Sequence, residues 1–263
     1  MGSKARVLAV IAISAMFIVL SLPSITVAAA SIGMRVESRT SHQFVCPTNS
    51  CSTNWSGYAV TGAVGSVSFV GGSWTVAAVS CPRRGSSYAA FWVGIDGYSS
   101  STVEQTGTLA QCSHGVASYS AWYEFYPSPM YTISSLTIKP GDVIKAQVQF
   151  TSGNTFVATI TDTTTGGTLS NTATVTSAQR SSAEWIAEAP SSNSGVLPLA
   201  NFGTASFGST STDTATMAGV TQAIGLFPTI WQITMTSGGG VLEAQPSGLG
   251  TDHSSFTVTW YSS

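Results

Sequence analysis

Short runs of β-branched and aromatic residues recur along most of the chain, and turn-forming Gly, Ser, Asn and Pro separate them. Runs of this length predict strands, and many of them in succession predict an all-β sandwich or barrel. No long amphipathic helical pattern and no fixed-period repeat interrupts them. The clearest predicted strands lie at residues 66–70, 88–95, 117–126, 143–150, 155–162, 231–235 and 255–260.

Alternation in three strands, near 88–96, 120–126 and 183–188, separates two faces, because successive strand side chains point to opposite sides of a sheet. One face is apolar and predicts core. The other face combines aromatic residues with carboxylates; across the three strands it holds Tyr88, Trp92, Asp96, Trp122, Glu124, Tyr126, Glu184, Ile186 and Glu188. Because the chain has only 11 Asp and Glu residues, this concentration is typical of a binding cleft. An ordinary solvated face is the alternative.

The N-terminal segment has a different character from the rest. Lys4 and Arg6 precede an apolar run over 7–22, and small residues follow at 28–30. This layout predicts a secretory signal peptide at residues 1–30. A membrane anchor is the alternative, but the run is shorter than the ~18–20 residues that a span needs. Residues 31–52 are predicted to be a leader or short propeptide, and residues 53–263 a single β-sandwich domain.

Charge is scarce, at 8% of residues, whereas aromatic residues make up 10%. The aromatic and apolar content argues against disorder. Acid unfolds proteins largely by protonating carboxylates that are paired in the native state, so a chain with few carboxylates suits an acidic medium. No basic patch is present, which argues against a nucleic-acid partner.

Four cysteines follow the predicted signal peptide, and an even count in an exported chain predicts two disulfides. Three pairings are possible. We favour Cys46–Cys51, which is local, and Cys81–Cys112, which brackets a strand-rich segment. A zinc site is the alternative, but the spacings do not match the usual Cys/His patterns.

Several common catalytic patterns are missing from the sequence, including G-x-S-x-G, H-E-x-x-H and the Asp-Thr-Gly or Asp-Ser-Gly signature of pepsin-like proteases. The three histidines lie in polar contexts typical of surface residues; they are His42, His114 and His253. Nothing in the sequence supports a Ser-His-Asp triad.

Carboxylates, one glutamine and aromatic residues remain, and here the sequence resembles the glutamic peptidases, or eqolisins. The resemblance rests on NWSG at 54–57, WVGIDG at 92–97 with QTG at 105–107, AWYEFYP at 121–127 and AEWIAE at 183–188. The order and spacing of the motifs agree with the family over roughly residues 53 to 260.

The resemblance implies a sandwich of two antiparallel sheets, similar to legume lectins, with a concave substrate cleft. It places the family's catalytic pair on Gln105 and Glu188. It places the family's substrate-binding residues on Trp55, Trp92, Asp96, Glu124 and Tyr126.

The implied protein is a secreted, extracellular endopeptidase that acts on polypeptides in an acidic environment, at roughly pH 2–5. It is expected to be a monomer, to need no metal or organic cofactor, and to have no membrane attachment after signal removal. A secreted carbohydrate-binding module with stacked Trp and Tyr, or a glycoside hydrolase using Glu124 and Glu188, is the alternative.

Overall fold

The computed structural model describes residues 44–45 and 50–263, which are built almost entirely of β-strands. The predicted signal peptide, most of the predicted leader and the predicted Cys46–Cys51 pairing lie outside the described residues. Within the described part, the single helical element is a 3-10 turn, η1 (Ile224–Leu226). The described chain has no helix with the length and apolar character needed to cross a membrane.

One layer contains the three strands whose alternation predicted two faces. In hydrogen-bonding order, its strands are β8 (Tyr131–Ile133), β7 (Val116–Tyr126), β6 (Val103–Ser113), β5 (Ser86–Ile95), β12 (Ser182–Glu188), β3 (Trp55–Thr61) and β18 (Ile230–Thr236). All these neighbours are antiparallel. Beyond β3, β2 (Ser50–Ser52) runs parallel to β18 and also pairs with β1 (Phe44–Val45).

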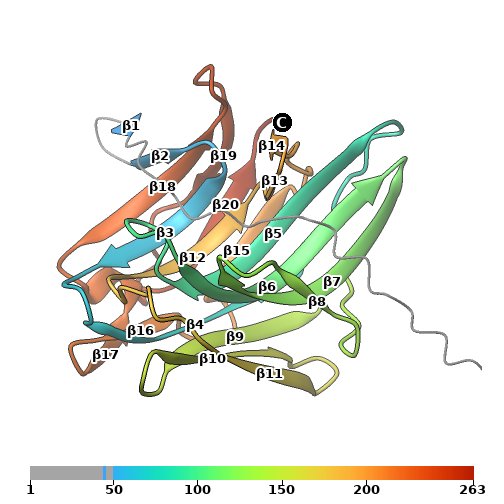
Figure 1. The fold of residues 1–263 in the computed structure, drawn as a ribbon. Coiled ribbons are helices and arrows are strands. Elements are labelled where there is room, and N and C mark those ends of the chain that lie inside the picture. The colour runs from blue at the N-terminus through green and yellow to red at the C-terminus, as the bar shows by residue number, and fades with distance from the viewer. Residues whose placement is uncertain (1–43, 46–49) are drawn as a thin grey trace, which may run out of the picture. The chain divides into compact units, whose positions relative to one another are not determined.

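The second layer packs against the first. Its strands are β11 (Gly167–Thr174), β10 (Thr155–Asp162), β9 (Val143–Phe150), β4 (Val67–Thr75), β16 (Thr214–Met217) and β17 (Val220–Ala223). Figure 1 shows β9, β10 and β11 running below β6 and β7, and contacts join β4, β9 and β10 to β5, β6 and β12.

The two layers are joined at one edge, so that hydrogen bonding continues from one to the other as an 18-stranded curled sheet among the described residues. The joining strands are β19 (Leu242–Pro246), β20 (Phe256–Trp260) and β15 (Thr204–Phe207), which link β18 to β4. A separate hairpin of β13 (Ser191–Ser192) and β14 (Gly195–Val196) follows β12. The predicted all-β sandwich is confirmed.

The main core lies between the layers and confirms the apolar face predicted from alternation. Phe91 and Val93 of β5 and Trp185 of β12 pack with Ile144 of β9 and Phe156 of β10. All are essentially inaccessible to solvent. Burying such a side chain contributes about 1.5–3 kcal/mol. This pairing of faces fixes the strand register, because a slip of one residue would turn the apolar side chains outward.

A second apolar cluster covers the opposite face of the first layer, and we call it the outer cluster. Its fully buried members include Trp55, Trp92, Trp122 and Ile186, and Tyr126 packs against them from its edge. Alternation predicted an aromatic and acidic face on this layer, and an ordinary solvated face was the alternative. In the structure, apolar side chains pack over this face, so it is not freely solvated.

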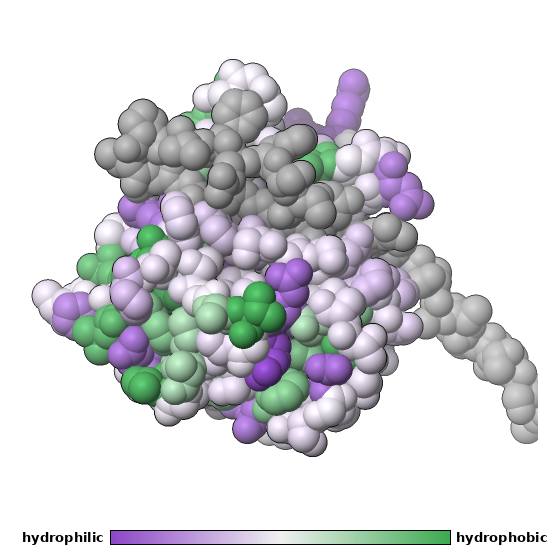
Figure 2. All heavy atoms as spheres, turned by 60° about the vertical axis from the view of Figure 1, so that its left-hand side comes forward, coloured by the Kyte–Doolittle hydropathy of each residue, from purple (hydrophilic) through white to green (hydrophobic). Residues whose placement is uncertain are grey.

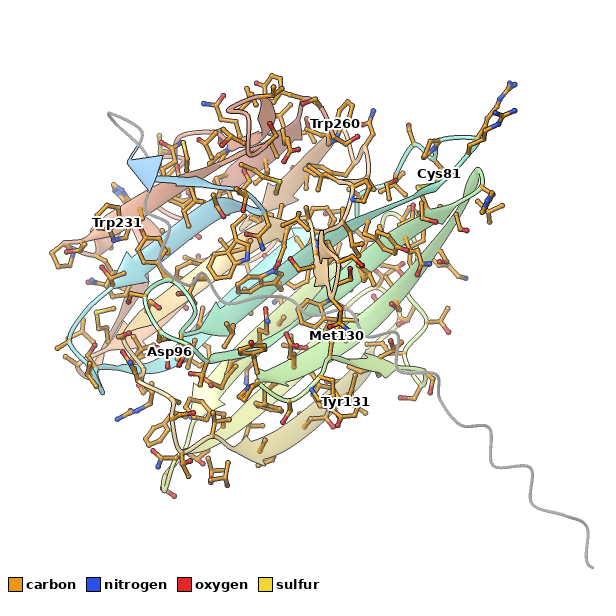
Figure 3. The ribbon with its side chains drawn as sticks, turned by 45° about the horizontal axis from the view of Figure 1, so that its top comes forward. Cys81, Asp96, Met130, Tyr131, Trp231 and Trp260 are labelled. Atoms are coloured by element: carbon orange, nitrogen blue, oxygen red, sulfur yellow. A yellow bond between two sulfur atoms is a disulfide. The ribbon has the colours of Figure 1, made fainter. Side chains whose placement is uncertain are left out.

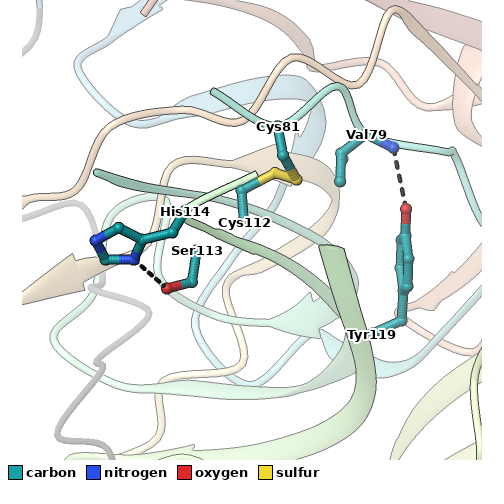
Figure 4. Close-up of a disulfide and its surroundings, with 6 residues drawn as sticks. All are labelled: Val79, Cys81, Cys112, Ser113, His114 and Tyr119. Carbon is teal, nitrogen blue, oxygen red and sulfur yellow. Dashed lines mark hydrogen bonds between the residues drawn. A yellow bond between two sulfur atoms is a disulfide. The ribbon is translucent and has the colours of Figure 1, made fainter. Parts of the chain in front are cut away.

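The predicted disulfide between Cys81 and Cys112 is present (Figure 4), with a Cα–Cα distance of 5.2 Å. It fastens the segment between β4 and β5 to β6. In the same region, the Val79 N–H donates to the Tyr119 hydroxyl at 3.0 Å. His114 lies beside Ser113 in the exposed β6–β7 turn, as its sequence context predicted.

One face of the molecule is mostly of intermediate hydropathy. On the face shown in Figure 2, pale residues of intermediate hydropathy predominate, and few residues are strongly hydrophilic. This agrees with the charged fraction of 8%.

Candidate active site

The strand register arranges the candidate residues in rows on the outer face of the first layer. Gln105 of β6 lies opposite Gly94 of β5 on one side and Glu124 of β7 on the other. Glu188, at the end of β12, lies opposite Trp55 of β3. The predicted catalytic pair therefore occupies the same face of one sheet, on strands separated by β5.

Two hydrogen-bond donors hold the Glu188 carboxylate. The Trp92 indole Nε1–H donates to Oε2 at 2.7 Å, and the Asn54 amide Nδ2–H donates to Oε1 at 3.0 Å. Both groups can only donate, so both carboxylate oxygens act as acceptors. The Trp55 ring packs edge-on against Trp92, with ring centroids 5.0 Å apart, and this contact restricts the indole that faces Glu188.

Burial raises the pKa of Glu188 well above its ordinary value of 4.5, and desolvation is the largest cause. The hydrogen bond from Trp92 lowers this pKa, the charge of Glu124 raises it, and the donors on Trp55 and Asn54 lower it. The Trp55 indole N–H completes no geometric hydrogen bond within the described chain, so we attribute most of the stabilisation of the charge to Trp92 and Asn54. Because Glu188 must be ionised to act as a base, its raised pKa moves the pH range expected for activity above the one expected from the sequence.

The Gln105 side chain is held by its neighbour on β7. Its Nε2–H donates to Glu124 Oε2 at 2.8 Å, and both side chains are fully buried. This bond fixes which end of the amide faces Glu124. The charge of Glu124 also raises the pKa of Glu188. The Gln105–Glu124 pair and Glu188 therefore interact electrostatically.

Two glycines make room for this arrangement. A Cβ on Gly94 would lie 2.9 Å from the Trp92 ring and 3.1 Å from the Gln105 Cβ. A Cβ on Gly107, which lies opposite Trp92, would lie 2.1 Å from the Phe91 carbonyl oxygen. The glycines of the WVGIDG and QTG motifs thus let Trp92 and Gln105 occupy adjacent positions.

Asp96 lies at the end of β5, as Figure 3 shows, and serves a different part of the structure. Its carboxylate accepts N–H groups of Gln179, Arg180 and Ser181 at 2.7, 2.6 and 2.9 Å. These bonds hold the segment that leads into β12, the strand that carries Glu188. The substrate-binding role of Asp96 stays a prediction.

Three acidic residues gather near that end of the sheet. Burial raises the pKa of both Glu104 and Glu184 well above 4.5, and the charge of Asp96 raises each of them further. The sequence placed Glu184 on the cleft face but gave no role to Glu104, which alternates with Gln105 and is fully buried. The raised pKa values favour the neutral form of Glu104 and Glu184.

Asn54 is the residue that sequence reasoning missed. It was noted only as part of the NWSG motif. In the structure its side chain is buried and bonded to Glu188. Its place directly before Trp55, a predicted site residue, was the one signal that the sequence offered. The hydrogen bond between Asn54 and Glu188 joins residues 134 positions apart, and the sequence pattern does not predict such a contact.

Comparison with known proteins gives a consistent result. A family model described as the Peptidase A4 family matches residues 53–258. Aspergillopepsin-2 of Aspergillus niger is 34% identical over 178 residues, which cover 59% of this chain and 62% of that protein. Scytalidopepsin B of Scytalidium lignicola is 34% identical over 140 residues, which cover 52% and 51%. The matches span about half to three fifths of these relatives.

Solved structures extend the likeness. Scytalido-glutamic peptidase, determined with a transition state analog inhibitor, superposes with a TM-score of 0.68 and 25% identity, over 80% of this chain and 99% of that one. Aspergilloglutamic peptidase from Aspergillus niger gives a TM-score of 0.57 and 32% identity, over 66% and 99%. The family match covers most of the described sheet, including every strand of the candidate site. This chain belongs to the Peptidase A4 family.

Proposed function

We propose that the chain is a secreted endopeptidase that hydrolyses peptide bonds with Glu188 and Gln105 as its catalytic pair. The observation that carries this proposal is the Glu188 carboxylate, buried and held by two obligate donors on the same face as Gln105. Family membership and the likeness to two glutamic peptidase structures support it.

In this mechanism Glu188, as carboxylate, takes a proton from the water that attacks the scissile carbonyl carbon. The Gln105 amide carries two N–H groups. One faces Glu124, and we assign the other to the oxyanion that forms on the carbonyl. Glu188 then returns the proton to the leaving nitrogen. No acyl-enzyme forms, and the scheme uses no metal or organic cofactor.

The remaining predicted residues divide into two groups. Glu124 orients Gln105, while Trp92, supported by Trp55, orients Glu188. Tyr126, half-buried at the edge of the outer cluster, is available to contact a bound polypeptide. Substrate contacts from Trp55, Trp92 and Glu124 remain part of the proposal.

Export to an acidic extracellular medium fits this activity. The predicted signal peptide supports export, and so does the Cys81–Cys112 disulfide, because such bonds persist in oxidising compartments. Action as a monomer, free of the membrane after signal removal, belongs to the same proposal.

The alternatives are not favoured by the comparisons. The family model that matches residues 53–258 and the similar solved structures are those of peptidases. The Trp92 N–H is engaged with Glu188.

Incubation of the purified protein with a denatured protein and, in parallel, with soluble polysaccharides at acid pH tests the function. We expect internal cleavage of the polypeptide, seen as new peptides by mass spectrometry, and no release of reducing sugar. Polysaccharide cleavage or binding, with an intact polypeptide, would favour the alternative.

A further inference from the structure

We propose that Asn54, oriented by Ser52, is a positioning residue that keeps Glu188 in its reactive carboxylate form. The inference rests on the proposed function, because it concerns the same carboxylate. It extends the site to residues 52–54, at the start of the domain, which carried no functional assignment.

The Ser52 hydroxyl determines which way the Asn54 amide points. Ser52 Oγ donates to Asn54 Oδ1 at 3.1 Å, and accepts the backbone N–H groups of Asn54 and Trp55 at 3.3 and 3.1 Å. With Oδ1 facing the hydroxyl, the NH₂ end faces Glu188 and donates to Oε1 at 3.0 Å. The chain of contacts gives each group a defined donor or acceptor role.

Asn54 also fixes the backbone beside Glu188. Its carbonyl oxygen accepts the N–H of Ala189, the next residue after Glu188, at 2.9 Å. The side chain and main chain of Asn54 therefore hold Glu188 at two points. Asn54 and Ser52 are both buried, so water competes little for these bonds.

The chemistry suits a base that must ionise although it is buried. An amide N–H stabilises the charged carboxylate without adding a second titrating group. The donor on Asn54 lowers the pKa of Glu188 and opposes the desolvation that raises it. Loss of this donor should make protonation of Glu188 easier.

Ser52 reaches the site through β2, which pairs with β18 in the sheet, with Met235 opposite Ser52. Its neighbour Cys51 is buried and disulfide-bonded. The leader predicted at 31–52 therefore ends in residues that this inference requires in the active enzyme.

The test is the pH dependence of kcat/KM for Asn54→Ala on an unfolded protein substrate. Removal of a hydrogen bond to a charged group should move the acidic limb upward by roughly one pH unit, and so lower activity on that limb about tenfold. Ser52→Ala, which keeps the amide but frees its orientation, should shift the limb less in the same direction. Asn171→Ala, on β11 in the other layer, is the matched control and should leave the profile unchanged.

Circular dichroism and thermal melting establish that each variant is folded, and Ser52→Ala carries the test if Asn54→Ala does not fold. A folded variant whose acidic limb stays in place overturns the positioning role. Glu188→Gln separates the two proposals: if it stays active, the catalytic assignment fails, whereas if it is inactive while Asn54→Ala keeps a normal profile, the Asn54 inference alone fails.

Discussion

Replacement of Glu188 by glutamine is expected to lower kcat/KM on an unfolded protein substrate by at least ~10²–10⁴-fold, the usual contribution of a general base. Glutamine keeps the size of the side chain and can still accept from Trp92 or Asn54, but it cannot take a proton from water. The variant should therefore fold. The measurement is initial-rate cleavage by the purified variant, with circular dichroism to verify the fold.

Glu184→Gln is the matched control, because Glu184 lies on the same strand and face but outside the proposed catalytic pair. Burial raises the pKa of Glu184 well above 4.5 and so favours its protonated form, which glutamine resembles, so the effect of this substitution should be small. Gln105→Ala should lower kcat by ~10²–10³-fold, as expected for loss of an oxyanion donor. Near wild-type turnover by folded Glu188→Gln would contradict the mechanism.

The fold is expected to be most stable in acid and to lose stability as the pH rises. Burial raises the pKa of Glu104, Glu184, Glu188 and Asp213 above their unfolded values. Below about pH 4 both states hold these protons, so stability is fully present. Above that pH the unfolded chain releases protons that the folded state retains, and each unit of difference costs about 1.4 kcal/mol.

Thermal melting at about pH 4 and about pH 8 should reveal this loss, with Tm lower at the higher pH by roughly 10 °C. The Glu104→Gln/Glu184→Gln double variant removes two of the buried acids and should flatten the decline. A Tm that rises with pH, or an unchanged slope in the folded double variant, would contradict the role of these residues.

Strand alternation predicted the most about the fold. Residues 143–150 and 155–162 are β9 and β10 as predicted, and the two faces of β5 pack as expected. Polar strands were missed. β11 (Gly167–Thr174) alternates Thr and Ser with few apolar residues, so it resembles a loop in sequence.

Contacts between distant segments were the other limit. The junction of the two layers depends on β15 pairing with β20, and the Glu188 site depends on Asn54 reaching the end of β12. Alternation predicts which face of the sheet a side chain occupies, but it does not predict which distant strand pairs with the strand that carries this side chain. For the same reason, alternation did not reveal that the Asp96 carboxylate holds the segment before β12.

The central claim, that the Glu188 carboxylate takes the proton from the attacking water, is tested most directly by the wild-type profile of kcat/KM from about pH 2 to about pH 8. The acidic limb reports ionisation of the base, whose raised pKa places that limb above 4.5. Activity should then peak on the acid side of neutrality and decline as the buried carboxyl groups acquire charge. A maximum at or above neutrality, with little activity in acid, would contradict the account.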